Sequence, residues 1–300
     1  MTGEGLGRGD MSAAKLIWDA KAPLGEGPLW SSRDNAVYWT DIKGHKLRRY
    51  RLADGGTDQW DMPEDIGWVV ERRNKPGFIA GFRSGIAELT LDPLKITHRL
   101  APESDLPGNR LNDAKADAQG RIWFGSMDDS ERAHSGNVYR LDPDFTAHRV
   151  DAGYICATGP TLARDGRVIY HTDSGARRNV RFDIGAGGSL SNKRVFAEFS
   201  EADGYPDGMT TDTEGYLWVA QWQGWGITRF RPDGSRDRFI PLPVSQVTSC
   251  CFAGPKLDRL FVTSARIGLS AQQLEKEPLA GGFFEVTPGV TGLPTEQFGG

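Results

Sequence analysis

A short pattern recurs six times along this chain, and it constrains the fold more than any other feature. Each copy begins with a small or polar dipeptide, continues through a turn, and ends in a short β-rich run. The runs start at Val37, Phe78, Ile122, Ile169, Leu217 and Leu260, which places successive copies 41 to 48 residues apart. A period of this length is typical of propeller blades that contain four short strands each. The sequence therefore predicts an all-β fold, a six-bladed β-propeller.

The two ends of the chain carry the strands that would close the ring. We expect the segment 14–19 (AKLIWD) to join the segment 281–286 (GGFFEV) in one shared last blade. Residues 14–300 then form a single propeller domain, and the Gly-rich, polar residues 1–13 form a disordered tail without the apolar core of a signal peptide. The segment 270–279 has the best helical pattern in the chain, and it predicts one helical turn or a loop.

Composition excludes several classes of protein. The net charge is −4 and there is no basic stripe, which argues against a nucleic-acid partner. No run approaches the roughly 18 apolar residues of a membrane span. The three cysteines, Cys156, Cys250 and Cys251, are too few and too closely placed for a disulfide framework, so we interpret them as small buried side chains in a reduced protein. We expect a cytoplasmic monomer or weak homo-oligomer.

The repeated dipeptides carry the residues that indicate chemistry. They are Glu26-Gly27, Ile66-Gly67, Asn112-Asp113, Thr158-Gly159, Asp207-Gly208 and Ser249-Cys250. Equivalent positions of successive blades meet around one axis, so Glu26, Asn112, Thr158 and Asp207 should converge. Two carboxylates that face each other repel unless a cation or a shared proton lies between them. Each dipeptide alone is a common turn, but the four in register favour a site for a divalent cation with oxygen ligands.

Several longer motifs, in the same order along the chain, resemble the SMP-30/gluconolactonase/regucalcin family. They are GEGPLW at 25–30, RLNDAKADAQGRIWFGSM at 110–127, PDGMTTDTEGYLW at 206–218 and TSARIGLS at 263–270. The resemblance extends from about Leu16 to Val286 and is strongest to bacterial sugar-acid lactonases of the xylonolactonase and arabinolactonase type. It implies a six-bladed propeller that hydrolyses aldonolactones with one divalent metal ion, which is calcium, zinc, manganese or iron in different members.

The resemblance also implies which residues hold the metal ion. The family's ligand positions fall on Glu26, Thr158 and Asp207, and Asp207 is also the proposed general base. The family usually has Asn where this chain has Thr158. A hydroxyl is shorter than a carboxamide and a poorer donor to a cation, so the identity of the metal depends on whether Thr158 binds it.

Substrate contacts follow from the same resemblance. The family's substrate-binding Arg and Asn fall on Arg110 and Asn112, with Asp113 beside them as a supporting residue. Glu131, in the poorly alignable loop 127–136, is a further residue on the substrate side. The partner these residues imply is a small sugar lactone.

A lactone is a cyclic ester, and its hydrolysis needs a polarised carbonyl and an activated water. A metal ion acts on the carbonyl as a Lewis acid, while Asp207 takes a proton from water and returns one to the ring oxygen. Two other functions stay open: hydrolysis of other esters or lactones by the same fold, and a metal-binding propeller without turnover.

Four further side chains fall near the expected mouth or in the expected strands. Trp68, Trp222 and Trp225 either form walls against a sugar ring or pack between blades. His171 stands in a strand beside Asp173, and we do not expect a catalytic dyad there.

Overall fold

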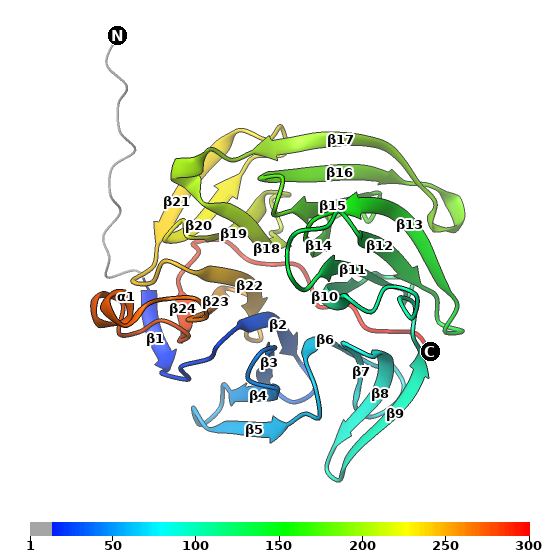
Figure 1. The fold of residues 1–300 in the computed structure, drawn as a ribbon, viewed down its shortest axis with the longest axis horizontal. Coiled ribbons are helices and arrows are strands. Elements are labelled where there is room, and N and C mark those ends of the chain that lie inside the picture. The colour runs from blue at the N-terminus through cyan, green and yellow to red at the C-terminus, as the bar shows by residue number, and fades with distance from the viewer. Residues whose placement is uncertain (1–13) are drawn as a thin grey trace.

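The computed structural model describes residues 14–300, which form six four-stranded antiparallel sheets around a central axis (Figure 1). The predicted six-bladed β-propeller is confirmed. The tail expected over residues 1–13 lies outside the described residues. Within residues 14–300, no helix is long and apolar enough to cross a membrane.

The first three blades follow one another along the chain, each with its innermost strand first. Blade 1 contains β2 (Gly25–Ser31), β3 (Ala36–Asp41), β4 (Lys46–Arg51) and β5 (Thr57–Asp61). Blade 2 contains β6 (Ile66–Glu71), β7 (Phe78–Phe82), β8 (Gly85–Leu91) and β9 (Leu94–Leu100). Blade 3 contains β10 (Asn109–Ala116), β11 (Ile122–Asp128), β12 (Gly136–Leu141) and β13 (Ala147–Tyr154).

The next two blades repeat this order and the last one joins both ends of the chain. Blade 4 contains β14 (Ala157–Leu162), β15 (Val168–Asp173), β16 (Arg178–Ile184) and β17 (Leu190–Glu198). Blade 5 contains β18 (Tyr205–Thr211), β19 (Leu217–Trp222), β20 (Gly226–Phe230) and β21 (Arg236–Pro241). Blade 6 contains β22 (Val247–Ala253), β23 (Arg259–Ser264), β24 (Phe283–Val286) and, as its outer strand, β1 (Ala14–Trp18).

The predicted closure by both chain ends is therefore confirmed, with β1 paired antiparallel to β24. The helical segment is α1 (Ala271–Lys276), whose start is capped by the Ser270 hydroxyl accepting the Gln273 N–H. Two three-residue 3-10 helices, Ala186–Gly188 and Glu201–Asp203, flank β17.

The apolar strands pack against blades on both sides, which explains their sequences. Side chains alternate between the two faces of a strand. In β11, Trp123 packs toward blade 4, whereas the adjacent Phe124 packs toward blade 2. In β19, Trp218 faces blade 6 and Val219 faces blade 4. Because both faces are buried, these strands are apolar at successive positions and show no polar alternation.

Six hydrophobic clusters hold the ring together, and each one lies between two neighbouring blades. The cluster between blades 1 and 2 contains Tyr38 and Phe78, whose ring centroids are 4.9 Å apart. The cluster between blades 6 and 1 contains Trp39 stacked on Phe283 at 5.4 Å. The ring therefore closes through the same kind of apolar contact that joins consecutive blades.

The C-terminal segment 287–300 crosses one end of the channel as a strap (Figure 1). Gly292 forms a bridge with Asp212 of blade 5, and Phe298 forms one with Arg72 of blade 2. The Phe298 ring is fully buried in the cluster between blades 2 and 3, 5.2 Å from the ring of Phe145. No repeat or motif in the sequence predicts this strap, which ties together blades that are distant along the chain.

We predict that Phe298→Ala lowers the free energy of unfolding by about 3 to 5 kcal/mol, because it removes a buried aromatic ring and leaves a cavity. Urea denaturation followed by Trp fluorescence measures the loss. The matched control is Phe239→Ala. The Phe239 side chain is 38% exposed, so this substitution should lower the free energy of unfolding by about 1 kcal/mol or less. Equal stability of the Phe298→Ala protein and the wild type would show that the strap contributes nothing to the ring.

Candidate functional site

The innermost strands are irregular at the repeated dipeptides. The pairing register breaks between Glu26 and Leu29 in β2, between Leu111 and Ala114 in β10, between Thr158 and Thr161 in β14, and between Pro206 and Met209 in β18. A β-bulge bends the strand and redirects the side chains at its position. The recurring irregularity accounts for the way these strands turn polar side chains toward the axis at one level of the ring.

Glycine follows the site residue where the backbones of neighbouring blades come close. Gly159 has φ of +55°, a left-handed conformation that L side chains rarely adopt. A Cβ on Gly208 would lie 2.1 Å from the Ser249 hydroxyl oxygen of the next blade. Crowding between neighbouring blades therefore favours Gly after the site residue in blades 4 and 5.

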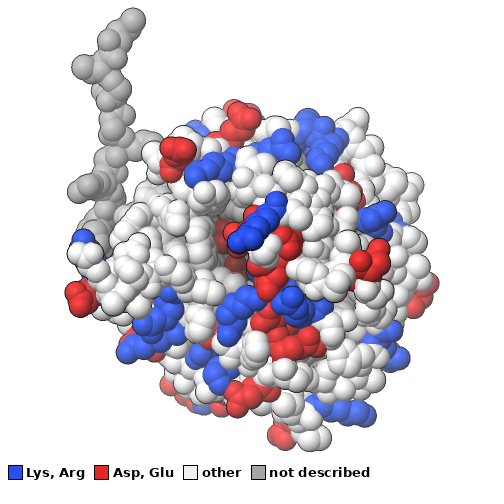
Figure 2. Space-filling model, viewed as in Figure 1, with Lys and Arg blue, Asp and Glu red and all other residues white. Residues whose placement is uncertain are grey.

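One cavity of about 580 Å³ opens at this level, at the end of the channel opposite the strap. It is lined by five of the six residues that the sequence predicts to bind the metal ion or the substrate: Glu26, Arg110, Asn112, Glu131 and Asp207. Thr158 is fully buried and does not line the cavity, but its hydroxyl donates to Asp207 Oδ1 at 3.3 Å. Figure 2 shows acidic and basic side chains gathered around a hollow near the centre of the molecule.

Glu26 and Asp207 are buried carboxylates without an ion-pair partner among residues 14–300. They are 5% and 8% exposed, and they accept bonds from neutral donors, the Gly27 N–H at 3.1 Å and the Thr158 hydroxyl. Burial raises the pKa of both carboxyls well above the usual range, and the charge of Asp207 raises that of Glu26 further. A cation placed between them would relieve this energetic cost.

Asp113 adds a third buried carboxylate beside these two. Its Oδ2 accepts the Gly159 N–H of the next blade at 3.0 Å, and its Oδ1 accepts the Ala114 N–H at 2.7 Å. Burial raises the pKa of Asp113, and its charge raises the pKa of both Glu26 and Asp207. The bond to Gly159 also fixes the peptide next to Thr158, which agrees with a supporting role.

The donor set fits a hard divalent cation better than a soft one. Among residues 14–300, no three His, Cys, Asp or Glu side chains form a group that could hold a metal ion. The site instead offers the carboxylates of Glu26 and Asp207 with the neutral hydroxyl of Thr158, and water would complete the shell. Oxygen ligands of this kind suit calcium, magnesium or manganese.

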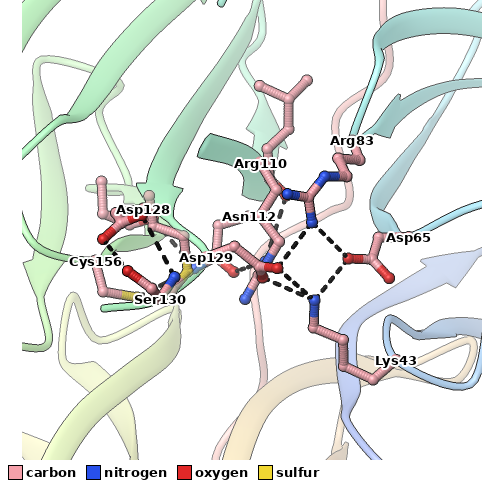
Figure 3. Close-up of polar contacts among 12 residues, drawn as sticks. Lys43, Asp65, Arg83, Arg110, Asn112, Asp128, Asp129, Ser130 and Cys156 are labelled. Atoms are coloured by element: carbon pink, nitrogen blue, oxygen red, sulfur yellow. Dashed lines mark hydrogen bonds and ion pairs between the residues drawn. The ribbon is translucent and has the colours of Figure 1, made fainter. Parts of the chain in front are cut away.

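Arg110 and Asn112 bind each other in the lining of the cavity. Arg110 Nη1 donates to Asn112 Oδ1 at 2.6 Å (Figure 3). Asn112 Nδ2 in turn donates to the Ala157 carbonyl at 3.2 Å, which anchors the pair to blade 4. The cavity therefore contains a cationic donor in addition to the two carboxylates, and we call the part lined by Arg110 and Asn112 its cationic wall.

The remaining candidates have different places. Trp222 lines the cavity, whereas Trp68 is a core residue at 1% exposure and Trp225 is 46% exposed. Cys156 lines the cavity, and burial and the charge of Asp207 raise the pKa of its thiol, so it is not a thiolate. Cys250 and Cys251 are buried free thiols.

His171 is not part of a dyad. Its ring is fully buried, and neither ring nitrogen has a hydrogen-bond partner among residues 14–300. Burial lowers the pKa of His171 to about 3, so the ring is neutral.

The sequence interpretation missed several lining residues, among them Lys43, Asp129 and Tyr205. Lys43 lies in the turn after β3 and Asp129 directly follows β11, so neither belongs to a repeated position. Tyr205 precedes the repeated dipeptide of blade 5 by two residues, and the same offset in blade 3 is Arg110, which is a signal that could have been used.

Comparison with known proteins agrees with this geometry. Residues 24–266 match the family described as "SMP-30/Gluconolactonase/LRE-like region". The chain is 34% identical to the L-arabinolactonase of Azospirillum brasilense over 96% of each chain, and 35% identical to the regucalcin of Danio rerio over 97% of this chain and all of that one. The chain belongs to the SMP-30/gluconolactonase family.

A solved structure of the same family supports the assignment. The calcium-binding protein regucalcin from Agrobacterium tumefaciens superposes with a TM-score of 0.89 at 25% identity, over 96% of this chain and 97% of that one. The family region 24–266 contains every site residue named above, whereas β1, β24 and the strap lie outside it. The site thus belongs to the part of the chain that is matched to the SMP-30/gluconolactonase family.

The raised pKa of Asp207 predicts how stability depends on pH in metal-free protein. The folded state keeps the proton more tightly than the unfolded chain, so stability is lost as pH rises above the unfolded value of about 4 and through the folded pKa. Asp207→Asn removes this loss. We expect it to unfold at higher temperature than the wild type at pH 7 and to show no such gain below about pH 4.

Differential scanning calorimetry of chelator-treated protein at several pH values measures the difference. Asp233→Asn serves as the control, since Asp233 is exposed and the Ser235 hydroxyl holds its pKa below the usual value. A gain for Asp207→Asn that is the same at all pH values would contradict the electrostatic origin.

Proposed function

We propose that this protein hydrolyses a sugar aldonolactone to the aldonic acid, with one divalent cation held by Glu26, Thr158 and Asp207. The observation that carries the proposal is a pair of buried carboxylates without ion-pair partners in the described part of the chain, which line a cavity of about 580 Å³ together with Arg110. The similarity to an L-arabinolactonase over nearly the whole chain supports a sugar lactone as the substrate class. A cavity of this volume accommodates a pentonolactone or a hexonolactone.

The cationic wall orients the substrate. Arg110 and Asn112 donate hydrogen bonds to the oxygens of the lactone, and Glu131 accepts from its hydroxyls. All three line the same cavity as Asp207. Trp222 and Tyr205 line it as well and offer apolar faces to the C–H groups of a sugar ring.

Asp207 performs the proton transfers. A bound divalent cation would supply Lewis-acid polarisation of the lactone carbonyl and a lowered pKa for water. As the water oxygen bonds to the carbonyl carbon, Asp207 takes a proton from that water, and it then returns one to the ring oxygen when the ring C–O bond breaks. A cation bound to Asp207 would make it a weaker base, but it would also lower the pKa of the attacking water. The Thr158 hydroxyl holds one oxygen of Asp207, which leaves the other for the water. The new carboxyl group ionises and releases a proton.

We predict that the protein acidifies a weakly buffered solution of xylono-, arabinono-, galactono- or gluconolactone, as followed by a pH indicator. A chelator should abolish the reaction, and adding back a divalent cation should restore it. Asp207→Asn should lower kcat by at least about 100-fold because it removes the base. The Asp233→Asn protein should keep wild-type activity.

The outcomes separate the competing functions. Unchanged turnover of Asp207→Asn would refute its role as base. A protein that binds the cation but is inert toward all four lactones would instead be a hydrolase of other esters or a metal-binding propeller without turnover.

A second prediction concerns Thr158, where the family usually has Asn. Thr158→Asn places a longer carboxamide oxygen beside Asp207 and should tighten binding of a divalent cation. Thr158→Val, which has the same shape without the oxygen, should weaken it. Isothermal titration calorimetry with calcium and manganese measures both, and equal affinities for all three proteins would exclude Thr158 as a ligand.

A further inference from the structure

Asp129 joins three blades at the mouth of the cavity. It directly follows β11 of blade 3, and its carboxylate accepts bonds from three cationic side chains (Figure 3). Arg110 Nε donates at 2.9 Å, Arg83 Nη1 at 2.8 Å, and Lys43 Nζ at 2.7 and 3.0 Å to the two oxygens. Lys43 comes from blade 1, Arg83 from blade 2 and Arg110 from blade 3. One carboxylate thus binds one cationic side chain from each of three consecutive blades.

The contacts of Arg110 leave one nitrogen of its guanidinium free. Nε is bonded to Asp129, and Nη1 is bonded to Asn112 Oδ1 and, at 3.4 Å, to the Leu111 carbonyl. Among residues 14–300, Nη2 has no protein acceptor. It is also not one of the fully buried side-chain atoms that lack a hydrogen-bond partner, so it is open to the cavity. The side chain as a whole is 5% exposed and lines the cavity. The plane of the guanidinium is therefore fixed by two partners, and its third nitrogen is available to a ligand.

We propose that Asp129 is a positioning residue, which sets the direction in which Arg110 presents Nη2 to the lactone. The inference deepens the proposed lactone hydrolysis and rests on it. Asp129 acts through Arg110, so its removal should change recognition of the lactone rather than the proton transfers at Asp207. An arginine held at Nε and Nη1 cannot rotate about its last bonds, and fixed donors lose less entropy when a ligand binds.

Lys43 and Arg83 keep Asp129 charged and in place. Burial acts to raise the pKa of Asp129, but bonds from Lys43 and Arg83 and the charge of Arg110 together lower it to about 2. The carboxylate is ionised at every pH at which such a protein would work. A neutral amide at this position would offer a single acceptor oxygen where three cationic donors converge, so the isosteric Asn cannot replace it.

Asp65 provides a matched control within the same network. It accepts Lys43 Nζ at 2.7 Å, contacts His45 Nε2 at 2.9 Å, and lies 3.7 Å from Arg83, but it does not contact Arg110. Asp65→Asn therefore disturbs the same cations without releasing Arg110. A purely structural role for the network would make the two aspartates equivalent.

The test compares kcat and KM of Asp129→Asn and Asp65→Asn with the wild type. We expect Asp129→Asn to lower kcat/KM by roughly 10- to 100-fold, mainly through KM, because Arg110 loses its orientation. Asp65→Asn should change it by less than about threefold. In an Arg110→Met background, Asp129→Asn should have no further effect, since the side chain through which it acts is gone.

Two results would overturn the inference. One is an effect of Asp129→Asn that is unchanged in the Arg110→Met background. The other is an equal loss in Asp65→Asn. If Asp129→Asn does not fold, Asp129→Glu replaces it. This variant retains the charge for Lys43 and Arg83 while moving the oxygens relative to Arg110 Nε, and it is compared in the same way with and without Arg110→Met.

An NMR measurement that does not depend on catalytic activity tests this inference separately from the proposed function. In the wild type, the Nε–H of Arg110 should give a slowly exchanging ¹⁵N–¹H signal, because it is bonded to Asp129 inside a protected site. The signal should be lost in Asp129→Asn and kept in Asp65→Asn. If the wild type hydrolyses no lactone, the proposed function fails, whereas a protected Arg110 signal that persists in Asp129→Asn contradicts the positioning role itself.

Discussion

The apolar contact between neighbouring blades is the interaction on which the rest of the structure depends. It recurs six times, once for every pair of adjacent sheets, and the last contact joins strands from opposite ends of the chain. Because the ring is closed, no blade can move outward without breaking two such contacts. The innermost strands are therefore held close to one another, and the axis becomes a place where side chains stay together even when their charges repel.

That confinement explains how three buried carboxylates can lie near enough for their charges to interact. Glu26, Asp113 and Asp207 each have a raised pKa, first of all because they are buried. In an open structure such groups would separate or turn toward water. Here the surrounding apolar contacts offset the cost, and a cation bound between the carboxylates would relieve their repulsion. The buried carboxylates lower the stability of the fold, and the apolar contacts of the surrounding ring compensate for this loss.

The sequence predicted the fold, and it predicted that polar residues of several blades meet at the axis, for one physical reason. Blades repeat, so residues such as Glu26 and Asp207 can be placed relative to each other by their offset in the repeat, although 180 residues separate them. The bulges that orient their side chains are repeated too. Asp129 and Lys43 follow no repeat, because turns at the rim differ in length and sequence from blade to blade. The strap with Phe298 was not predicted for the same reason: its partners are dispersed over the ring and leave no period in the chain.

The same difference divides the cavity into two parts with different tasks. The floor is made from the innermost strands, whose positions the ring fixes, and it holds the groups suited to a cation and to proton transfer. The wall is made from the ends of β10 and β11 and from turns of two other blades, joined by Lys43, Arg83 and Asp129. Contacts on the floor are determined by blade packing and cannot vary without disturbing it. Contacts on the wall depend on turns that can change independently, so differences in the choice of lactone among members of such a fold should arise at the wall. Arg110 belongs to an innermost strand but is oriented by a rim residue, which makes it the point where the two parts meet.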